Sequence, residues 1–458
     1  MNSLNRREFL DTAKKTSVGL AAGVTILQSA KSVRGYPANE KVILASVGLG
    51  GRGPGLAAGF LERDDCEIAY GCDPNSKQFG KAKAFEAQQG KAVKCVQDFR
   101  KALDDPAVDA IVSATPDHWH ALSAVWACQA GKDVYVEKPA CHSCWEGRKM
   151  VEAARKYKRV VQIGTQNRSA PYNMSAKKYI EDGKLGTIHM CRIYNQKGAW
   201  GMTKKGPDGP TPEGLDWDMW NGPAPEHAYN TGMHRTWNHQ WRYSGGDIAN
   251  DASHQIDLAR WLLGVEHPKT VYSTGGRYAT ADPATLVAET PDTQMALYDY
   301  DGLLVSFELT LYGSYMLKTD PEVRNTDMFP YWFQNSTRIE IFGTEGLMVV
   351  GRHGGGWQVF VRTKDRKPVV KAQDYGRFPD PDHKENFISC IKSREEPNAD
   401  VEKGHISALL IHYANISYRL GGQKLVIDPK TEGIVDNPAA MEIFKRSYRK
   451  PWVIPEEV

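Results

Sequence analysis

Short apolar runs alternate with helical stretches over the first third of the chain. The apolar runs cover residues 41–47, 66–72, 109–114, 133–136 and 159–163, and helical patterns occupy 118–130 and 145–157. Runs in which nearly every position is apolar are typical of strands buried on both faces of a parallel sheet. The order of these elements therefore predicts an α/β fold with a doubly wound parallel sheet over residues 39–165.

The pattern changes after about residue 186, where the β runs become longer and the turns tighter. The β runs are 187–195, 270–278, 293–300, 303–311, 338–342 and 357–362, and helical stretches cover 172–182, 251–263 and 401–419. Asp301-Gly302 lies between two of these runs as a hairpin turn. Residues 166–458 are therefore expected to form a C-terminal α/β domain with a largely antiparallel open sheet. Two domains suit a chain of 458 residues.

The N-terminus has the pattern of an export signal. Arg6-Arg7 precedes a run of small and apolar residues at 17–27, which resembles a twin-arginine (Tat) signal. That run is shorter than the roughly 20 residues that span a bilayer, so no stable membrane insertion is expected. Residues 1–38 are predicted to be a signal and linker, and the mature protein to be periplasmic. The alternative is a disordered or amphipathic arm.

Charge and composition exclude several classes of protein. With 41% hydrophobic and 25% charged residues, the chain is not disordered. The formal charge of +3 comes mainly from the N-terminus, because residues 35–458 hold 52 Lys and Arg against 53 Asp and Glu. A nearly neutral body gives no electrostatic reason to expect a nucleic-acid partner.

The cysteines leave one question open. Cys141 and Cys144 are close enough in sequence for a redox or metal-binding pair. However, Ser143 and Glu146 also have the spacing of a capping box that opens the following helix, and no second cysteine pair has zinc-finger spacing. The structural interpretation is favoured, and no metal site is predicted.

A glycine-rich turn follows the first apolar strand. Gly48, Gly50 and Gly53 form a G-x-G-x-x-G pattern that also includes Gly51 and Arg52. The glycines permit a tight turn, close approach of a pyrophosphate and close helix–strand packing, and the helix N-terminus offers free N–H groups. Asp73 follows the second strand, twenty residues past Gly53. Its carboxylate can accept hydrogen bonds from a ribose and would repel a 2′-phosphate, so NAD is favoured over NADP.

Two further motifs complete a family pattern. One is Thr115-Pro-Asp-His-Trp-His120 with Glu137-Lys138-Pro139, and the other extends from Gly245 through Asn250-Asp-Ala-Ser-His254 to Asp257. With the glycine turn, these features resemble the Gfo/Idh/MocA oxidoreductases. The resemblance covers nearly the whole mature chain. It implies a Rossmann domain, a second domain whose open sheet supports a homo-oligomer (dimer or tetramer), and a position for Lys138 beside the nicotinamide and the substrate hydroxyl.

The chain departs from the family pattern at one position. The family usually carries Asp-x-x-x-His on an interfacial helix, but here Asn250 lies four residues before His254. On one continuous helix these two side chains share a face, and Asp251 is turned away by about 100°. Asn cannot take a proton, so the acid–base work is expected to fall on Lys138 and His254. The predicted catalytic residues are Lys138, His254 and Asn250.

Strand ends near the crevice supply further candidates, and residues 237–243 supply the others. The predicted cofactor contacts, besides the glycine turn and Asp73, are Thr115, Pro116, Trp119, His120, Glu137, Lys138 and Gln166. The predicted substrate contacts are Arg168, Trp237, His239, Arg242 and Tyr243. His120 has packing or capping as its alternative, and Asp257 is expected to be a structural partner. Tryptophans 200, 217, 220, 237 and 241, in or after a Gly- and Pro-rich loop at 198–225, either stack on a sugar or fix the loop to the core.

These features predict an NAD-dependent oxidoreductase acting on a secondary alcohol of a sugar or sugar derivative. An exported enzyme has no pool of free NAD, so its cofactor is expected to be tightly bound and recycled within the catalytic cycle. One alternative is a redox-neutral glycoside hydrolase or lyase that works through transient oxidation at C3. The other is a non-catalytic sugar-binding protein stabilised by its cofactor.

Overall fold

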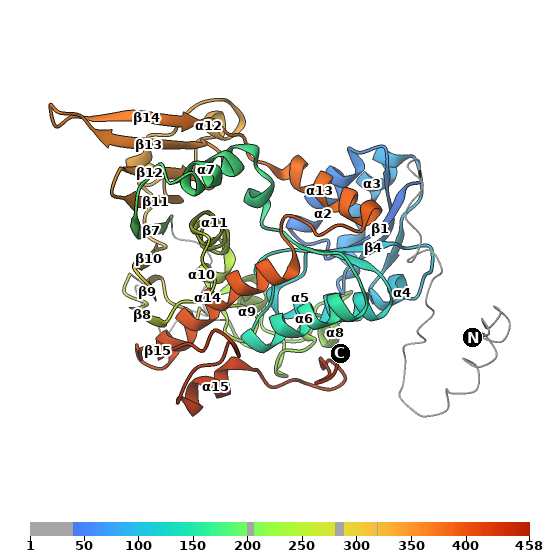
Figure 1. Cartoon of the computed structure of the whole chain (residues 1–458). Coiled ribbons are helices and arrows are strands. Elements are labelled where there is room, and N and C mark those ends of the chain that lie inside the picture. The colour runs from blue at the N-terminus through green and yellow to red at the C-terminus, as the bar shows by residue number, and fades with distance from the viewer. Residues whose placement is uncertain (1–39, 199–205, 280–287, 318) are drawn as a thin grey trace, which may run out of the picture.

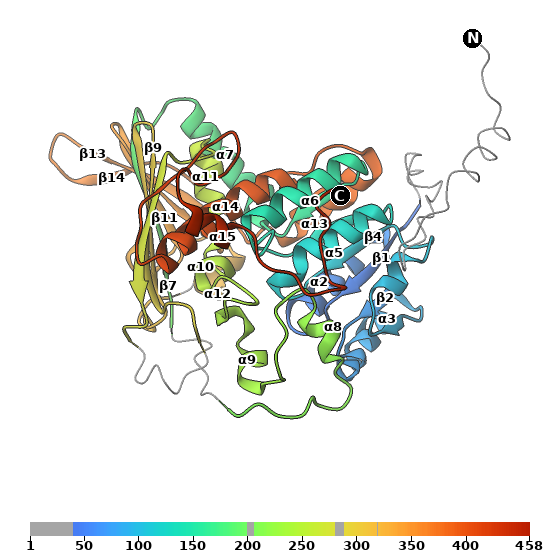
Figure 2. The same cartoon turned by 90° about the horizontal axis from the view of Figure 1, so that it is seen from below.

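The computed structural model describes residues 40–198, 206–279, 288–317 and 319–458, which form two β-sheets with their helices (Figure 1). The proposed signal at 1–38 and Trp200 lie outside these residues. The larger sheet stands at one side of the molecule and the smaller one at the other, and helices fill the space between them (Figures 1 and 2).

The first sheet is parallel throughout and has the strand order β3-β2-β1-β4-β5-β6. Its strands are β1 Val42–Val47, β2 Cys66–Cys72, β3 Lys94–Val96, β4 Ala110–Ser113, β5 Asp133–Val136 and β6 Val161–Ile163. β4, β5 and β6 are buried at every position, because helices cover both faces of the sheet. The order reverses between β1 and β4, which opens a crevice at the carboxyl ends of these strands. The Rossmann prediction is confirmed.

Helices of the N-terminal region flank this sheet. They are α2 Arg52–Leu61, α3 Ala82–Gln89, α4 Arg100–Leu103, α5 Asp117–Gln129 and α6 Cys144–Lys156, with 3₁₀ turns η2 Ser76–Lys81 and η3 Gln166–Ser169. The capping box expected at Ser143 does not form. Glu146 instead accepts the backbone N–H of His142 at 3.0 Å, and the Ser143 hydroxyl has no partner in the described ranges.

The second sheet has nine strands in the order β14-β13-β12-β11-β7-β10-β9-β8-β15. They are β7 Ile188–Gln196, β8 Thr270–Gly276, β9 Thr293–Tyr300, β10 Leu303–Thr310, β11 Arg338–Gly343, β12 Gly346–Gly351, β13 Trp357–Arg362, β14 Pro368–Asp374 and β15 Leu425–Val426. β7 and β10 pair in parallel and the other neighbours are antiparallel, so the sheet is mixed and largely antiparallel, as expected.

Helices cover one face of the second sheet and leave the other open (Figure 2). They are α7 Pro171–Glu181, α10 Asp247–Asn250, α11 Ser253–Leu263, α14 Val401–Arg419 and α15 Pro438–Phe444. Shorter helices occupy the loops, namely α8 Trp217–Asn221, α9 Thr231–Arg235, α12 Pro321–Asn325, η4 Trp237–His239 and η5 Trp332–Gln334. β9 shows why one face is open: its positions alternate between buried and exposed, as a half-covered strand requires.

One helix late in the chain belongs, by its packing, to the first sheet. In α13 Asp380–Ser393, Phe387, Ile388 and Ile391 are fully buried in one cluster with strand residues of β1 and with Phe60 of α2. Trp452 and Ile454 pack similarly into the cluster around α5 and α6. The sequence pattern divides the chain after residue 165, but the core of the first domain is completed by residues more than 200 positions later.

Several elements have no counterpart in the sequence-based prediction, among them β3, β12, β14 and α13. The outer strand β14 is mostly exposed and lacks an alternating pattern, and α13 begins with Asp-Pro-Asp-His, which masks its apolar side. The expected helix at 251–263 is present as α11, which begins at Ser253, and a break separates it from α10, which ends at Asn250. Among the described residues, no helix is both long and apolar enough to cross a membrane.

Candidate active site

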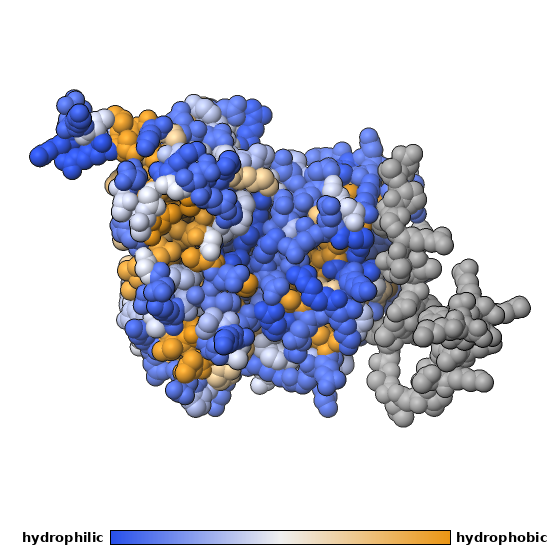
Figure 3. All heavy atoms as spheres, viewed as in Figure 1, coloured by the Kyte–Doolittle hydropathy of each residue, from blue (hydrophilic) through white to orange (hydrophobic). Residues whose placement is uncertain are grey.

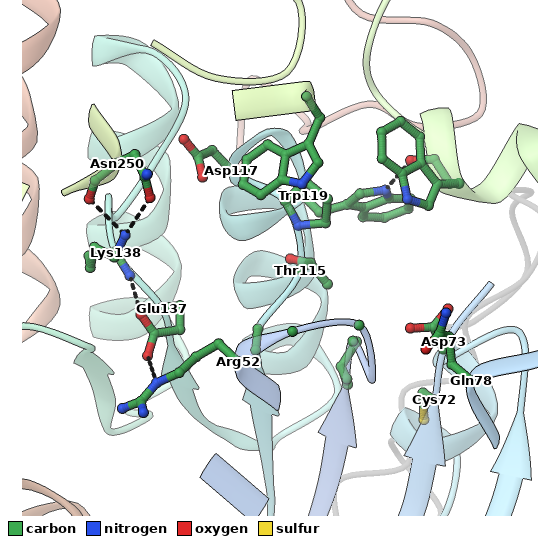
Figure 4. Close-up of a pocket in the computed structure, with 18 of the residues that line it drawn as sticks. Arg52, Cys72, Asp73, Gln78, Thr115, Asp117, Trp119, Glu137, Lys138 and Asn250 are labelled. Atoms are coloured by element: carbon green, nitrogen blue, oxygen red, sulfur yellow. Dashed lines mark hydrogen bonds and ion pairs between the residues drawn. The ribbon is translucent and has the colours of Figure 1, made fainter. Parts of the chain in front are cut away.

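A cavity of about 590 Å³ lies where the two domains meet. Its walls come from the carboxyl ends of β1, β2, β4 and β5 in the first domain, and from α10, α11, α12 and the turn after β12 in the second. In Figure 4, Asp73 and Gln78 stand at one end of the cavity, and Lys138, Glu137 and Asn250 at the other. This elongated site is at the switch point of the sheet, where ligands of open α/β folds bind.

The glycine turn has the geometry that its spacing predicts. Gly48 has φ +90°, and a Cβ there would lie 2.6 Å from the carbonyl oxygen of Ala114. A Cβ at Gly53 would lie 1.8 Å from the carbonyl oxygen of Gly48, so this glycine is needed for α2 to approach β1. At Gly50 and Gly51 a Cβ would meet no heavy atom within 4 Å, and both residues line the cavity. The turn therefore offers open space in front of the helix N-terminus, as a pyrophosphate requires.

Asp73 anchors the other side of this turn. Its Oδ2 accepts the backbone N–H of Leu49 at 2.8 Å, and its Oδ1 accepts that of Asn75 at 2.8 Å. The side chain is 7% exposed, and burial raises its pKa above the ordinary value. Each oxygen keeps a second lone pair for a ligand hydroxyl. Asp73 therefore fixes the loop and faces the position that a ribose would occupy.

Lys138 and Asn250 are brought together across the domain boundary. Lys138 Nζ donates to the backbone oxygen of Asn250 at 2.7 Å and to its Oδ1 at 3.1 Å (Figure 4). Because both oxygens come from one residue at the C-terminal end of α10, the amine is held in a single position. Two of its hydrogens are used, and one tetrahedral position of Nζ remains for a ligand.

His254 and Asp251 line the same cavity, which corrects one expectation. Asp251 was expected to point away, but the break between α10 and α11 turns it inward, where it meets Arg352 at 3.3 Å and Lys197 at 3.4 Å. Burial, together with the nearby cations Arg352 and Lys138, lowers the pKa of His254 well below its ordinary value. His254 is therefore a neutral imidazole at physiological pH, and neither ring nitrogen has a hydrogen-bond partner within the described residues.

Arg52, Glu137 and Gln166 form a bridge below Lys138. Arg52 Nε donates to Glu137 Oε1 at 3.2 Å, and its Nη2 donates to Asp380 of α13 at 2.6 Å. In the amide orientation that satisfies both of its neighbours, Gln166 accepts from Arg52 Nη2 at 3.2 Å. These contacts hold the start of α2 against the strand end that carries Lys138.

The remaining sequence-based candidates divide into two groups. Thr115, Pro116, Trp119 and Trp237 line the cavity. His120 does not, because both of its ring nitrogens bond to backbone oxygens, of Pro139 at 2.7 Å and of Thr115 at 2.9 Å. It is a packing residue, the alternative given for it above.

Most of the proposed substrate contacts are placed elsewhere. Arg168 is 3% exposed and bonds to both carboxylate oxygens of Asp257, at 2.9 and 3.0 Å. His239 and Tyr243 are fully buried, and Arg242 lines a separate pocket. Arg168 follows the end of β6, which places it near the crevice, but its side chain is directed by its partner Asp257. The cavity is therefore not lined by four of the five predicted substrate contacts, namely Arg168, His239, Arg242 and Tyr243. Asp257 is a structural partner of Arg168.

Two of the tryptophans fix the loop to a small core, and two line the cavity. Trp217 and Trp220 stack with ring centroids 5.0 Å apart, and they pack with Tyr229 and Tyr243 in a small core that fixes the loop. Trp220 and Trp237 also line the cavity, so their rings are available to a ligand there.

Cys141 and Cys144 are free buried thiols, and Cys141 Sγ lies 3.6 Å from His412 Nε2.

The cavity residues that the sequence reasoning missed include four from the second domain, Arg324, Arg352, His353 and Phe378. Arg352 and His353 follow β12 in a turn closed by Gly354, Gly355 and Gly356, all with positive φ. A Cβ at Gly356 would lie 1.9 Å from the backbone oxygen of Asp374, so the turn requires glycine. That run of three glycines was the available signal for these two residues.

The fold and the site together define a two-domain dinucleotide-dependent oxidoreductase. Two profiles of one family match the chain: "Oxidoreductase family, NAD-binding Rossmann fold" over residues 43–165, and "Oxidoreductase family, C-terminal alpha/beta domain" over 173–274 and 349–454. The chain belongs to the Gfo/Idh/MocA oxidoreductase family, and its first domain is an NAD-binding Rossmann domain.

Similar proteins include sugar-modifying enzymes. Levoglucosan dehydrogenase of Pseudarthrobacter phenanthrenivorans is 28% identical over 263 residues, which is 55% of this chain and 57% of that protein. A glycosyl hydrolase family 109 protein of Solibacter usitatus is 33% identical over 212 residues, 43% of this chain and 47% of that protein. The matches thus span about half the length of these relatives. The structure of levoglucosan dehydrogenase with NADH and levoglucosan shares the fold, with a TM-score of 0.62 at 20% identity, covering 84% of this chain and 99% of that one.

Proposed function

We propose that the protein oxidises a secondary alcohol of a sugar or sugar derivative with NAD, using Lys138 as the group that takes the hydroxyl proton. The observation that carries the proposal is the position of the Lys138 amine. It is fixed by Asn250 at 2.7 and 3.1 Å inside a cavity whose other end has the features of a dinucleotide site. Bound NAD⁺ supplies the hydride acceptor for such a reaction.

The chain's own residues account for the proton and for substrate placement. In its neutral form Lys138 donates two N–H groups to Asn250, and its lone pair is free to accept the substrate O–H proton. His254 is neutral and unpartnered in the described residues, so it can bind a second substrate hydroxyl or pass a proton onward. Asn250 positions Lys138 and takes no proton. Trp220 and Trp237 offer ring faces suited to the C–H side of a sugar.

The test is a Lys138→Ala variant of the full-length protein. We expect turnover of a responsive sugar to fall by about 10²- to 10⁴-fold, the range for loss of a general base, with bound NAD retained. Lys178→Ala is a matched control, because this lysine is 74% exposed and pairs with Asp182 on the surface. Unchanged turnover in Lys138→Ala would reject the assignment. Ligand-induced stabilisation without any product in the wild type would favour the non-catalytic sugar-binding protein instead.

A second candidate is redox-neutral glycoside cleavage, and the similarity to glycosyl hydrolase family 109 proteins supports it. Transient oxidation at C3 would acidify the C2 proton, and loss of that proton would eliminate the aglycone from C1 and leave a C1=C2 double bond. Water would then add its oxygen at C1 and a proton at C2, and the hydride would return to C3. In D₂O such a reaction incorporates deuterium at C2 of the released sugar, without net formation of NADH. A simple dehydrogenase accumulates NADH stoichiometrically and shows no such exchange.

We further propose export by a Tat-type signal in residues 1–38, with NAD loaded before export and recycled within the catalytic cycle. Protein purified from its export pathway without added cofactor should then carry nucleotide that dialysis does not remove. Protein that arrives empty, and needs added NAD for every turnover, contradicts this proposal.

The open face of the second sheet supports a homo-oligomer. Tyr272, Met295, Leu297 and Leu304 point outward from β8, β9 and β10 and are 37–48% exposed. Figure 3 shows further apolar patches over the half of the molecule that holds the second sheet. Contiguous exposed apolar residues are typical of an interaction surface. Light scattering should give a dimer or tetramer, and Leu297→Glu should shift it toward the monomer.

A further inference from the structure

Two arginines stand at the catalytic end of the cavity. Arg352 is 5% exposed, and its Nη2 contacts Asp251, the residue after the Asn250 that holds Lys138. Arg324 comes from α12, and its backbone oxygen accepts the N–H of Phe378. Asp73 and Gln78 mark the opposite, adenosine end of the cavity (Figure 4). The two arginines therefore line the end of the cavity that holds Lys138.

Neither guanidinium is fully paired within the described residues. Arg352 Nε is buried and has no hydrogen-bond partner. The Arg324 guanidinium lies 4.2 Å from the centre of the Phe378 ring and has no hydrogen bond or ion pair. The stacking fixes its direction without neutralising its charge. A partly buried cation without a carboxylate is unfavourable for the free protein, which points to a partner brought by a ligand.

The carboxylates of Asp380, Glu137 and Asp251, which lie near the two arginines, already form ion pairs with other cations or with Arg352. Asp380 pairs with Arg52 at 2.6 Å and with Lys384 at 2.8 Å, and Glu137 pairs with Arg52. Asp251 is shared between Arg352 and Lys197. Arg324 therefore forms no ion pair with Asp380, Glu137 or Asp251 in the described residues, and the one further carboxylate at this end of the lining, that of Asp117, accepts from the Ser244 hydroxyl.

The glycine turn after β12 and helix α12 bring the Arg352 and Arg324 side chains together. Gly354 has φ +88°, and a Cβ there would lie 3.0 Å from the backbone oxygen of Arg324. The glycine turn that carries Arg352 thus packs directly against the helix that carries Arg324. Two guanidinium groups from separate segments are brought to one place although they repel each other.

We propose that Arg324 and Arg352 bind an anionic substituent of the sugar, a carboxylate, sulfate or phosphate group, while a neighbouring hydroxyl faces Lys138. Guanidinium groups bind such oxyanions through paired N–H donors, which also fixes the orientation of the sugar. This inference rests on the proposed function, because it names the class of substrate for the same site. The cofactor's pyrophosphate has its own place at the N-terminus of α2 and does not need these residues.

The experiment compares four probes on the NAD-loaded protein: a methyl glucuronide, a sugar sulfate, a sugar phosphate and the neutral methyl glucoside. Both thermal stabilisation and formation of reduced nicotinamide are measured. We expect at least one anionic probe to be favoured over the neutral one by about 10- to 100-fold, the size expected for a hydrogen bond to a charged group. The probe that responds identifies the anion.

Arg324→Gln should abolish that preference, measured as the ratio of kcat/KM for the anionic and the neutral probe, and leave the affinity for NADH unchanged. Arg324→Lys should keep part of it, because the charge is retained. Arg377→Gln is the matched control, since this arginine is 67% exposed and pairs with Asp327. Equal use of neutral and anionic probes by the wild type, or a loss of NADH affinity in Arg324→Gln, would overturn the proposal.

Failure of the two proposals can be told apart. Binding of an anionic probe that depends on Arg324 but gives no turnover supports the anion subsite and contradicts the oxidoreductase proposal. Turnover of neutral sugars that is insensitive to Arg324 supports the oxidoreductase and rejects the subsite.

Discussion

The buried ion pair between Arg168 and Asp257 allows a quantitative test of whether Arg168 is a structural residue or a substrate contact. Their side chains are 3% and 1% exposed, and Arg168 makes three hydrogen bonds of 2.9–3.0 Å to the carboxylate. If Arg168 is structural, Arg168→Met should destabilise the protein and leave substrate affinity unchanged. If it were a substrate contact, KM would rise.

The expected magnitude follows from what each substitution leaves behind. Arg168→Met leaves Asp257 buried, but Ser407 still donates to that carboxylate at 2.6 Å, so we expect a loss near the lower end of the usual range, about 3 kcal/mol. Asp257→Asn leaves two cations without a carboxylate, Arg168 and Arg260. Burial and the neighbouring Arg168 already lower the pKa of Arg260 to about 10. We therefore expect the larger loss here, about 5 kcal/mol.

The assay is denaturant unfolding of the NAD-loaded protein, combined with KM for a responsive sugar. Lys178→Met removes an exposed pair with Asp182 and should leave the free energy of unfolding nearly unchanged. The reasoning is refuted if Arg168→Met unfolds at the same denaturant concentration as this control, or if its KM rises while its stability is kept.

Three further predictions concern the cofactor site and pH. Gly53→Ala should destabilise the protein even without cofactor, because its Cβ would lie 1.8 Å from the Gly48 carbonyl oxygen. The Cβ of Gly50→Ala meets open space, so this variant should weaken only NAD binding. Thermal unfolding with and without NAD distinguishes the two effects. Asp73→Ala should reduce the preference for NAD over NADP, measured as the ratio of their dissociation constants, and an unchanged ratio would argue against a ribose contact. Burial lowers the pKa of His383 to about 4 and that of His254 well below its ordinary value. Both therefore stay neutral in the folded state while the unfolded chain takes up protons, so unfolding free energy should fall below pH ~6.5 by about 1.4 kcal/mol per pH unit for each histidine. A stability that is flat between pH ~6.5 and ~5 would contradict this.

The part of the site that the sequence predicts is the part held by local backbone geometry. Gly48, Gly53 and Asp73 lie within one strand–turn–helix–strand unit, so their spacing nearly determines their positions. Lys138 follows a strand end by the same logic. Its contact with Asn250 joins segments 112 residues apart and was not predicted from the sequence.

The residues that sequence analysis missed or misplaced depend on contacts between distant segments. Arg352 enters the cavity because three successive glycines turn the chain after β12, and Arg324 because α12 packs against that turn. Asp251 was misplaced because a continuous helix was assumed where two short ones meet. Arg168 was misassigned because its carboxylate partner lies 89 residues away. Periodicity and spacing carry no information about such pairings.

The packing of α13 and of the Trp452 region into the first domain has a consequence for how the chain acquires its structure during synthesis. When a ribosome has released the chain only as far as β6, the surfaces that Phe387, Ile391 and Trp452 will cover are still open to water. The nucleotide-binding half is made first, yet its core closes only after most of the second half has followed. We therefore expect folding of both halves to be completed together, late in translation, and a chain stopped after residue 165 to be aggregation-prone.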